Sequence, residues 1–242
     1  MPSLADPYLK TARTKEHLED LRYRLIAFEK SKPCTFSRQD DLENRRHIIR
    51  FHIREMADKL PLIVGDFLYC LRSSLDQLVW ALAQVGGIDY PDGTQFPIFS
   101  KPNPKKFGDF TFGVPAEAVK IIDHLQPYHG RDREAIQSHL LWRLNALCNI
   151  DKHRRIPTDA TVIDFSFPDF PSQYLPFAVF DHDEEMISVP LFLKSYVALD
   201  PEITVNVVFG DSHEGIRCLF GDLKQMYDFV TDDVIPRFSR FF

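Results

Sequence analysis

The segment that most constrains the fold of this chain is the apolar stretch over residues 61–85, PLIVGDFLYCLRSSLDQLVWALAQV. Apolar side chains recur in it at three- and four-residue steps, which predicts a helix, and further apolar side chains occupy its other faces. The helical stripe comprises Leu68, Leu71, Leu75, Leu78, Val79 and Leu82. Gly86 and Gly87 predict the end of the helix, because glycine readily adopts the left-handed cap conformation. We expect this helix to be central and mostly buried.

Helical periodicity extends to other parts of the chain. The predicted helices cover residues 5–30, 61–85, about 115–125, about 133 into the cluster at 149–155, and 213–238. For the last of these, Ser212 is the expected N-cap, with Glu214 and Gly215 in the first turn. The phenylalanine-rich terminus, RFSRFF, is expected to dock on the core or on a second subunit.

Strands are predicted where the period changes to two. Residues 45–55, RRHIIRFHIRE, alternate in polarity, with Ile49, Phe51 and Ile53 on the side expected to be buried. After Pro157 the chain becomes β-rich, with short strands predicted at 161–167, 177–180, 186–193 and 203–209. Two segments are interpreted as connectors without regular structure: residues 31–44 and 87–115. The second connector is expected to be clamped to the core by Phe96, Pro97, Ile98 and Phe99.

These elements predict an α+β fold, in which the long N-terminal, central and C-terminal helices form a core and a small antiparallel sheet precedes the last helix. We expect one domain over residues 1–242. Its parts are an N-terminal helix (1–30), a motif-bearing core (45–160), a β-rich insertion (161–210) and a C-terminal helix (213–238).

The composition argues against several classes of protein. A formal charge of −6 and a pI near 5.8 exclude a generally basic, DNA-coating protein. Apolar runs fall short of the ~18 residues that a membrane helix needs, and the N-terminus lacks the apolar core of a signal peptide, so no membrane association is expected. The four cysteines form no CxxC pair. They predict a reducing compartment, the cytoplasm by default, without a disulfide framework or a cysteine zinc site.

Residues 140–155, LLWRLNALCNIDKHRR, join an apolar helical pattern to a dense polar cluster at its end. On the central helix, Arg72 and Asp76 lie four residues apart, so they share a face and can pair. Because buried polar groups need partners, we expect this pair to meet residues of the cluster 149–154 across a helix–helix contact. The interpretation we favour is a structural network of ion pairs and hydrogen bonds that fixes the packing.

The alternative is a catalytic or binding site centred on His153. A histidine titrates near neutral pH, so it can act as general acid or base, oriented by Asp76 or Asp151. The residues that would hold a phosphate or carboxylate are Arg72, Asn149, Lys152 and Arg154. The plainer explanation is that His153 caps or packs the helix end, where cations also complement the helix dipole.

Other site types find less support. The nine histidines show neither HxxxH nor HExxH, and residues 182–185, HDEE, are expected in a solvated turn. No dinucleotide, P-loop or hydrolase-elbow motif occurs. We therefore expect no metal centre and no cofactor. One face of the strand over 45–55 is basic and can contact phosphates, but we favour cross-strand pairing with the acidic segment 181–185. That face carries Arg46, Arg50, His52 and Arg54.

Four motifs resemble those of an uncharacterised bacterial protein family. They are a GDxLxxLRxxLD helix, an FPI segment, an LQPY turn and an NxDKHR helix end, found here at residues 65–76, 96–98, 125–128 and 149–154. The resemblance covers about residues 45–160. Members often have histidine where this chain has Gln77. The family implies no established activity.

More loosely, the helical core is similar to the HEPN superfamily, many of whose members are metal-independent ribonucleases or nucleotide-binding partners of toxins. In that superfamily an arginine and a histidine, four to six residues apart, usually act across a dimer. Here Asn149 precedes His153 by four residues, and Arg143 precedes His153 by ten. No arginine therefore occupies the matching place. The resemblance implies a homodimer and RNA or a nucleotide as partner, at the level of fold analogy.

Two functions are therefore predicted from the sequence. The favoured one is a non-catalytic helical module for binding or assembly, with a polar junction between Arg72, Asp76 and residues 149–154. The alternative is an HEPN-like, metal-independent ribonuclease or nucleotide-binding protein of a toxin or defence system that uses His153.

Overall fold

The computed structural model describes residues 1–56, 59–181, 184–211 and 215–242. The chain forms two compact units. The first consists of Met1–Arg22, Asp58–Pro157 and Phe209–Phe242, and the second of Tyr23–Ala57 and Thr158–Val208. The fold is α+β with a helical core, as the sequence predicts. That the two units form the single domain expected over 1–242 stays a prediction.

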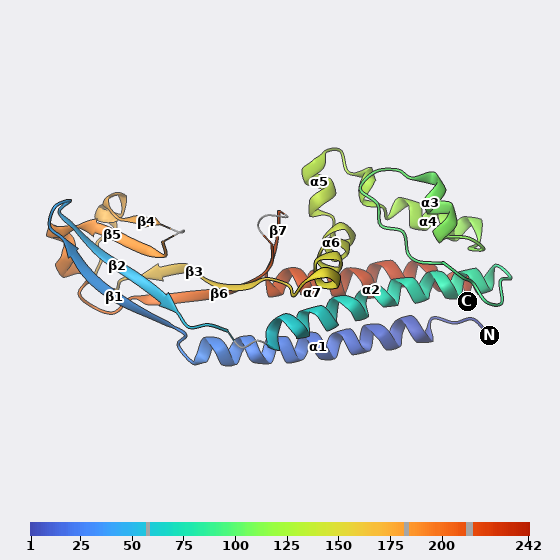
Figure 1. Ribbon diagram of the computed structural model, residues 1–242, viewed down its shortest axis with the longest axis horizontal. Helices are drawn as coiled ribbons and strands as arrows, with labels where there is room; N and C mark the ends of the chain where they lie inside the picture. The colour runs from blue at the N-terminus through green and yellow to red at the C-terminus, as the bar shows by residue number, and fades with distance from the viewer. Residues whose placement is uncertain (57–58, 182–183, 212–214) are drawn as a thin grey trace. The chain divides into compact units, whose positions relative to one another are not determined.

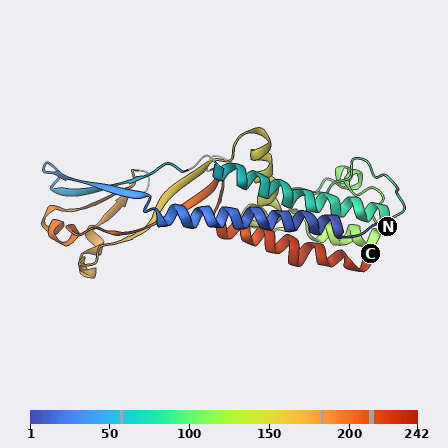
Figure 2. The same cartoon turned by 90° about the horizontal axis from the view of Figure 1, so that it is seen from below.

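The first unit is built around the expected central helix, α2 (Lys59–Val85). Most of its apolar residues are buried, including Phe67 and Leu75, neither of which is exposed at all, whereas Leu62, Tyr69 and Trp80 are exposed. Gly87 follows its end with a φ of +97°, the left-handed conformation that the sequence predicts there. The first-unit part of α1 (Ala5–Lys30) and helix α7 (Phe220–Asp228) lie alongside α2 in both views (Figures 1 and 2).

The connector expected over residues 87–115 contains a helix, α3 (Pro104–Phe110), so the prediction of an irregular segment was wrong there. The side chain of Asn103 caps this helix by accepting a hydrogen bond from the backbone N–H of Lys106 at 3.1 Å. Earlier in the segment, Phe96, Pro97 and Ile98 are buried as expected. Helix α4 (Ala116–His124) and a short turn over Pro127–His129 follow.

The helix predicted from about residue 133 is divided in two. Helix α5 (Arg133–Ser138) ends before His139, whose backbone is extended, and α6 (Leu140–His153) begins after it. Helix α6 contacts α2, which agrees with the expected helix–helix contact.

The expected C-terminal helix over 213–238 begins later than predicted. Ile216–Cys218 form a strand, β7, and the helical segment starts at Phe220 and continues through a π-helical stretch and a 3₁₀ turn to Phe241. Ile216 and Cys218 are buried on one side of β7, an alternation that a helical stripe can mimic over so few residues. The predicted N-cap at Ser212 and the first-turn Glu214 lie outside the described residues. Phe238 is fully buried, so the aromatic terminus docks on the core.

The second unit carries most of the β structure. One sheet has the order β1-β2-β5-β4 and another has the order β3-β6-β7. The end of β6 that pairs with β7, Phe209–Asp211, belongs to the first unit. The strands are β1 (Cys34–Asp41), β2 (Arg46–Ile53), β3 (Thr158–Ser166), β4 (Val179–Asp181), β5 (Met186–Pro190) and β6 (Glu202–Asp211).

Strand β1 corrects the prediction of a polar connector over 31–44. It pairs antiparallel with β2 along its whole length, from Cys34 opposite Ile53 to Asp41 opposite Arg46. An edge strand of this kind can carry polar side chains because its backbone, rather than its side chains, makes the pairing. The two strands before α2 therefore form one sheet with β5 and β4 from the β-rich insertion expected over 161–210.

On the basic face of β2, Arg50 pairs with the acidic segment 181–185, as the favoured interpretation predicted, whereas Arg46 bonds to Ser188 instead. Arg50 forms an ion pair with Glu184 at 3.3 Å, and Arg46 donates to the Ser188 carbonyl at 2.6 Å. His182 and Asp183 of the acidic segment lie outside the described residues. In the part of the chain that is described, no helix combines the length and apolarity needed to cross a membrane. The four cysteines are free thiols, and Cys70, Cys148 and Cys218 are buried.

Candidate functional site

Arg72 and Asp76 form the ion pair predicted from their spacing, with 3.1 Å between Arg72 Nη2 and Asp76 Oδ1. Both also hold the backbone of Phe96. Arg72 donates to its carbonyl at 2.6 Å, and Asp76 accepts from its N–H at 2.9 Å. Burial raises the pKa of the Asp76 carboxyl, and Arg72, the Phe96 N–H and Lys152 oppose that rise. The pair thus fixes the FPI segment against α2.

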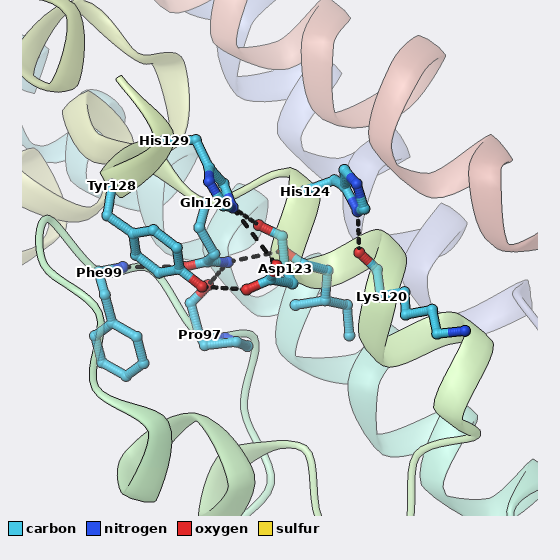
Figure 3. A network of polar contacts seen from close by, with 9 residues as sticks. Pro97, Phe99, Lys120, Asp123, His124, Gln126, Tyr128 and His129 are labelled. Carbon is cyan, nitrogen blue, oxygen red and sulfur yellow. Dashed lines mark hydrogen bonds and ion pairs between the residues drawn. The ribbon is translucent and has the colours of Figure 1, made fainter. Parts of the chain in front are cut away.

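Gln126 holds the other end of the same segment (Figure 3). Its side chain is 1% exposed and accepts a hydrogen bond from the Phe99 N–H at 3.1 Å. Its amide nitrogen donates to the carbonyls of Pro97 at 2.7 Å and Ile122 at 3.1 Å. Arg72, Asp76 and Gln126 therefore form one structural assembly, which we call the FPI clamp. It connects three of the four motifs found in the sequence.

The LQPYHG turn also caps the end of α4 (Figure 3). His124 Nδ1 lies 2.6 Å from the Lys120 carbonyl, and His129 Nε2 lies 2.9 Å from the Asp123 carbonyl, so each ring donates to a backbone group near the helix end. Tyr128 donates to the Asp123 carboxylate. Burial and this hydrogen bond raise the pKa of Tyr128. These contacts account for the turn without a ligand.

One face of α6 is turned to α2. The Cys148 thiol donates to the Leu68 carbonyl at 3.6 Å, and its burial raises its pKa to about 12. Asp151 lies against the backbone of Gly65 so closely that a Cβ on that glycine would be 2.6 Å from Asp151 Oδ1. Burial, followed by repulsion from Asp66, raises the pKa of Asp151. We call this surface, Cys148, Asp151 and Lys152, the packed face of α6.

The opposite face of α6 is open. Two pockets of about 460 Å³ and about 470 Å³ lie along it, and both are lined by Trp142 and Ile216. The first is also lined by residues at successive helical steps, namely Asn145, Ala146, Asn149, Ile150 and His153. Because the two pockets share residues, we treat them as one surface, the α6 groove. Asn149 and His153 are exposed, and Trp142 and Asn145 are half-buried.

The wall of the α6 groove opposite the helix is the hairpin of β6 and β7. Gly210, with a φ of +118°, pairs with Arg217, and a Cβ there would lie 2.4 Å from the Ile216 carbonyl, so the position requires glycine. This close pairing places Ile216 at the groove.

An ion pair and a hydrogen bond fasten this wall to α6, and a second ion pair fastens α6 to α7. Arg154 pairs with Asp211 at 2.6 Å, and Arg143 pairs with Asp222 at 2.9 Å and donates to the Arg217 carbonyl at 2.8 Å. Asp222 also accepts from the Leu219 N–H at 2.7 Å, at the start of α7. Arg143 and Arg154 therefore act first as structural residues, since a carboxylate already neutralises each of them.

Other polar groups on the groove are uncommitted. Across the described ranges, the side chains of Asn145, Asn149 and His153 make no hydrogen bond, and those of Arg133 and Arg217 make no ion pair. Arg133 and Arg217 are exposed and line the second pocket together with Glu134. Among the described residues, the groove thus combines the indole of Trp142, three amides including that of Gln137, an imidazole and two available guanidinium groups.

The residues predicted from the sequence fall into two groups. Arg72, Asp76, Asp151 and Lys152 lie where α2 and α6 meet, and Asn149, His153 and Arg154 line the α6 groove. Residues 151 and 153 point about 200° apart on a helix, because each residue turns it by about 100°. His153 is consequently not brought together with Asp76 or Asp151.

Sequence reasoning overlooked Trp142, Asn145, Arg133 and Arg217 as members of a site. The spacing of Trp142, Asn145, Asn149 and His153, three or four residues at each step, was a signal that could have identified a polar stripe on one side of the helix. The run DKHRR at residues 151–155 groups neighbours in sequence, and neighbours in sequence lie on different faces of a helix.

No group of three or more histidine, cysteine, aspartate or glutamate side chains suited to a metal ion is found among the residues that the structure describes. Comparison of the chain with protein-family models, with curated proteins and with solved structures gives no match.

Proposed function

We propose that this protein is a non-catalytic binding module and that the α6 groove is its ligand-binding surface. The observation that carries the proposal is the stripe of Trp142, Asn145, Asn149 and His153, whose amide and imidazole groups line an open pocket and make no hydrogen bond within the described residues. Folding alone does not require an aromatic ring and two amides in line on an accessible helix face. In the FPI clamp, by contrast, the side chains of Asp76 and Gln126 already form hydrogen bonds with the backbone of residues 96–99.

The two tryptophans of the chain make the proposal testable. Trp142 lies in the α6 groove, whereas Trp80 lines a separate pocket with Gln77 and Gln84. In a Trp80→Phe variant the tryptophan fluorescence comes from the groove alone, and Trp142→Phe provides the matched control. We expect a binding probe to change the emission of Trp80→Phe saturably and to leave that of Trp142→Phe unchanged. Mononucleotides, single-stranded oligonucleotides and peptides are the probes to compare.

A second candidate function is RNA cleavage through His153. The observation in its favour is that the imidazole of His153 is exposed in the α6 groove, where a substrate could reach it. Against it, no carboxylate orients the ring within the described residues, although a positioned partner is what general acid–base catalysis by histidine normally requires. The HEPN-like relationship, a homodimer and an RNA or nucleotide partner stay proposals of this second function. Equal RNA cleavage by the wild type and His153→Ala would contradict it.

A further inference from the structure

We infer that the occupant of the α6 groove is an extended segment of a partner protein that carries an acidic side chain. This inference rests on the proposed binding function and specifies the class of ligand.

The amides of Asn145 and Asn149 are spaced to match an extended peptide. Residues four apart on a helix are separated by about 6 Å along its axis. An extended chain advances by about 3.3 Å per residue, so it presents equivalent N–H and C=O groups on one edge every ~6.6 Å. A primary amide both donates and accepts, so each asparagine can pair with both backbone groups of one peptide residue. His153, four residues further along, lies in the same row.

Trp142 lies at the start of this row and lines both pockets, as does Ile216 on the opposite wall. A ligand side chain between the indole and Ile216 would be held between two apolar surfaces, where a half-buried aromatic ring contributes contact area with little loss of conformational freedom. A peptide that pairs with the amides therefore also finds an anchor for one side chain.

The charge of the groove favours an acidic peptide over a nucleic acid. Four arginines line the two pockets, but Arg143 and Arg154 are paired with carboxylates and Glu134 offsets a third, which leaves about one net positive charge. Arg133 and Arg217 suit one carboxylate of a ligand. A polyphosphate backbone needs several unpaired cations and usually successive aromatic platforms, whereas the described lining of this groove offers one indole, Trp142, and the imidazole of His153 about three turns further along α6.

Selection from a displayed library of random eight-residue peptides against the whole protein tests the inference. We expect enriched sequences to share an aspartate or glutamate at one position and to change Trp142 emission in the Trp80→Phe variant. Affinity should fall at least tenfold in the double variant Asn145→Ala/Asn149→Ala and stay within twofold in Gln225→Ala, which removes an exposed amide from α7. Arg133→Ala/Arg217→Ala should remove the preference for an acidic residue.

Synthetic variants of a selected peptide separate backbone recognition from side-chain recognition. N-methylation of single backbone amides removes a donor without changing a side chain, so we expect an at least tenfold loss at alternate positions and little effect between them. The inference is overturned if the selection enriches no peptide whose affinity depends on Asn145 and Asn149. So does a peptide whose affinity is indifferent to N-methylation throughout.

The outcomes also distinguish the inference from the function on which it rests. If a decauridine oligonucleotide or a mononucleotide changes Trp142 emission and depends on the asparagine pair while peptides do not, the groove is a binding surface for nucleic acid. The proposed function then stands and the peptide inference falls. If no probe of any class changes Trp142 emission, both fall. Far-UV circular dichroism of each variant shows whether it is folded.

Discussion

The two faces of helix α6 both carry polar side chains, but they border different surroundings. On the packed face, Asp151 lies against Gly65, and the exposed Lys152 slightly opposes the rise in the pKa of Asp76, although neither side chain makes a hydrogen bond or ion pair within the described residues. On the groove face, Asn145, Asn149 and His153 have no hydrogen-bonding partner among the described residues. The faces therefore differ in what lies against them: Asp151 packs against the backbone of α2, whereas the groove residues line open pockets.

The FPI clamp extends this contrast to the motifs. Arg72, Asp76 and Gln126 look like site residues in the sequence because they are polar and lie beside apolar segments. In the structure they serve the backbone of residues 96–99, which has no strand or helix partner of its own. Backbone groups at a buried segment need partners, and side chains supply them here.

The largest expected effect comes from removing a member of the FPI clamp. Asp76→Ala leaves the Phe96 N–H without its acceptor and the largely buried Arg72 without its counter-charge. A hydrogen bond to a charged group is worth about 1.5–3 kcal/mol, so we expect the free energy of unfolding to fall by about 2–3 kcal/mol. Urea unfolding followed by circular dichroism measures it.

Asp76→Asn is the matched control, because its amide oxygen can still accept from Phe96, and it should lose clearly less stability than the alanine variant. An alanine variant as stable as the wild type would mean that Asp76 is not structural. That result would return Asp76 to the candidates for a site.

The next effect concerns the contact of the packed face with α2. Alanine in place of a helical glycine normally adds about 0.5–1 kcal/mol of stability. At Gly65 the added Cβ would lie 2.6 Å from Asp151 Oδ1, so we expect Gly65→Ala to lose about 1 kcal/mol instead. In an Asp151→Ala background the same change should become stabilising. A double-mutant cycle of unfolding free energies measures this reversal of sign; equal effects in both backgrounds would show that the two residues are not coupled.

A smaller, pH-dependent effect follows at Asp151. Its pKa is raised, so the folded state holds the proton more tightly than the unfolded state, and ionisation costs stability. The stability that the protonated carboxyl contributes is fully present below the ordinary aspartate pKa and is lost as the pH rises through the higher pKa of the folded state. Asp151→Asn should therefore have the higher Tm at pH 7, and the difference should close towards about pH 4. Thermal melts across this range check the sign, and a difference that widens on acidification would contradict it.

Apolar periodicity was sufficient to predict α2 and its end at Gly87, and helical spacing was sufficient to pair Arg72 with Asp76. Neither pattern could identify Phe96 as the shared partner of Arg72 and Asp76. Phe96 lies 24 residues along the chain from Arg72, and the contact depends on how the connector folds back. Strand β1 was missed because an edge strand needs few apolar residues. The polar stripe on α6 could have been found from its spacing, whereas the ion pairs that remove Arg143 and Arg154 from consideration arise only in three dimensions.

The smallest expected effect on stability is on the groove face, and it is the one that separates the two faces most sharply. Asn145→Ala and Asn149→Ala remove no hydrogen bond within the described residues, and alanine is the better helix former. Each variant should therefore unfold within about 0.5 kcal/mol of the wild type, in either direction. The same variants are expected to lose ligand binding at the α6 groove. A loss of 2 kcal/mol or more in either would mean that the amide is structural after all, and the two faces of α6 would then differ in exposure but not in role.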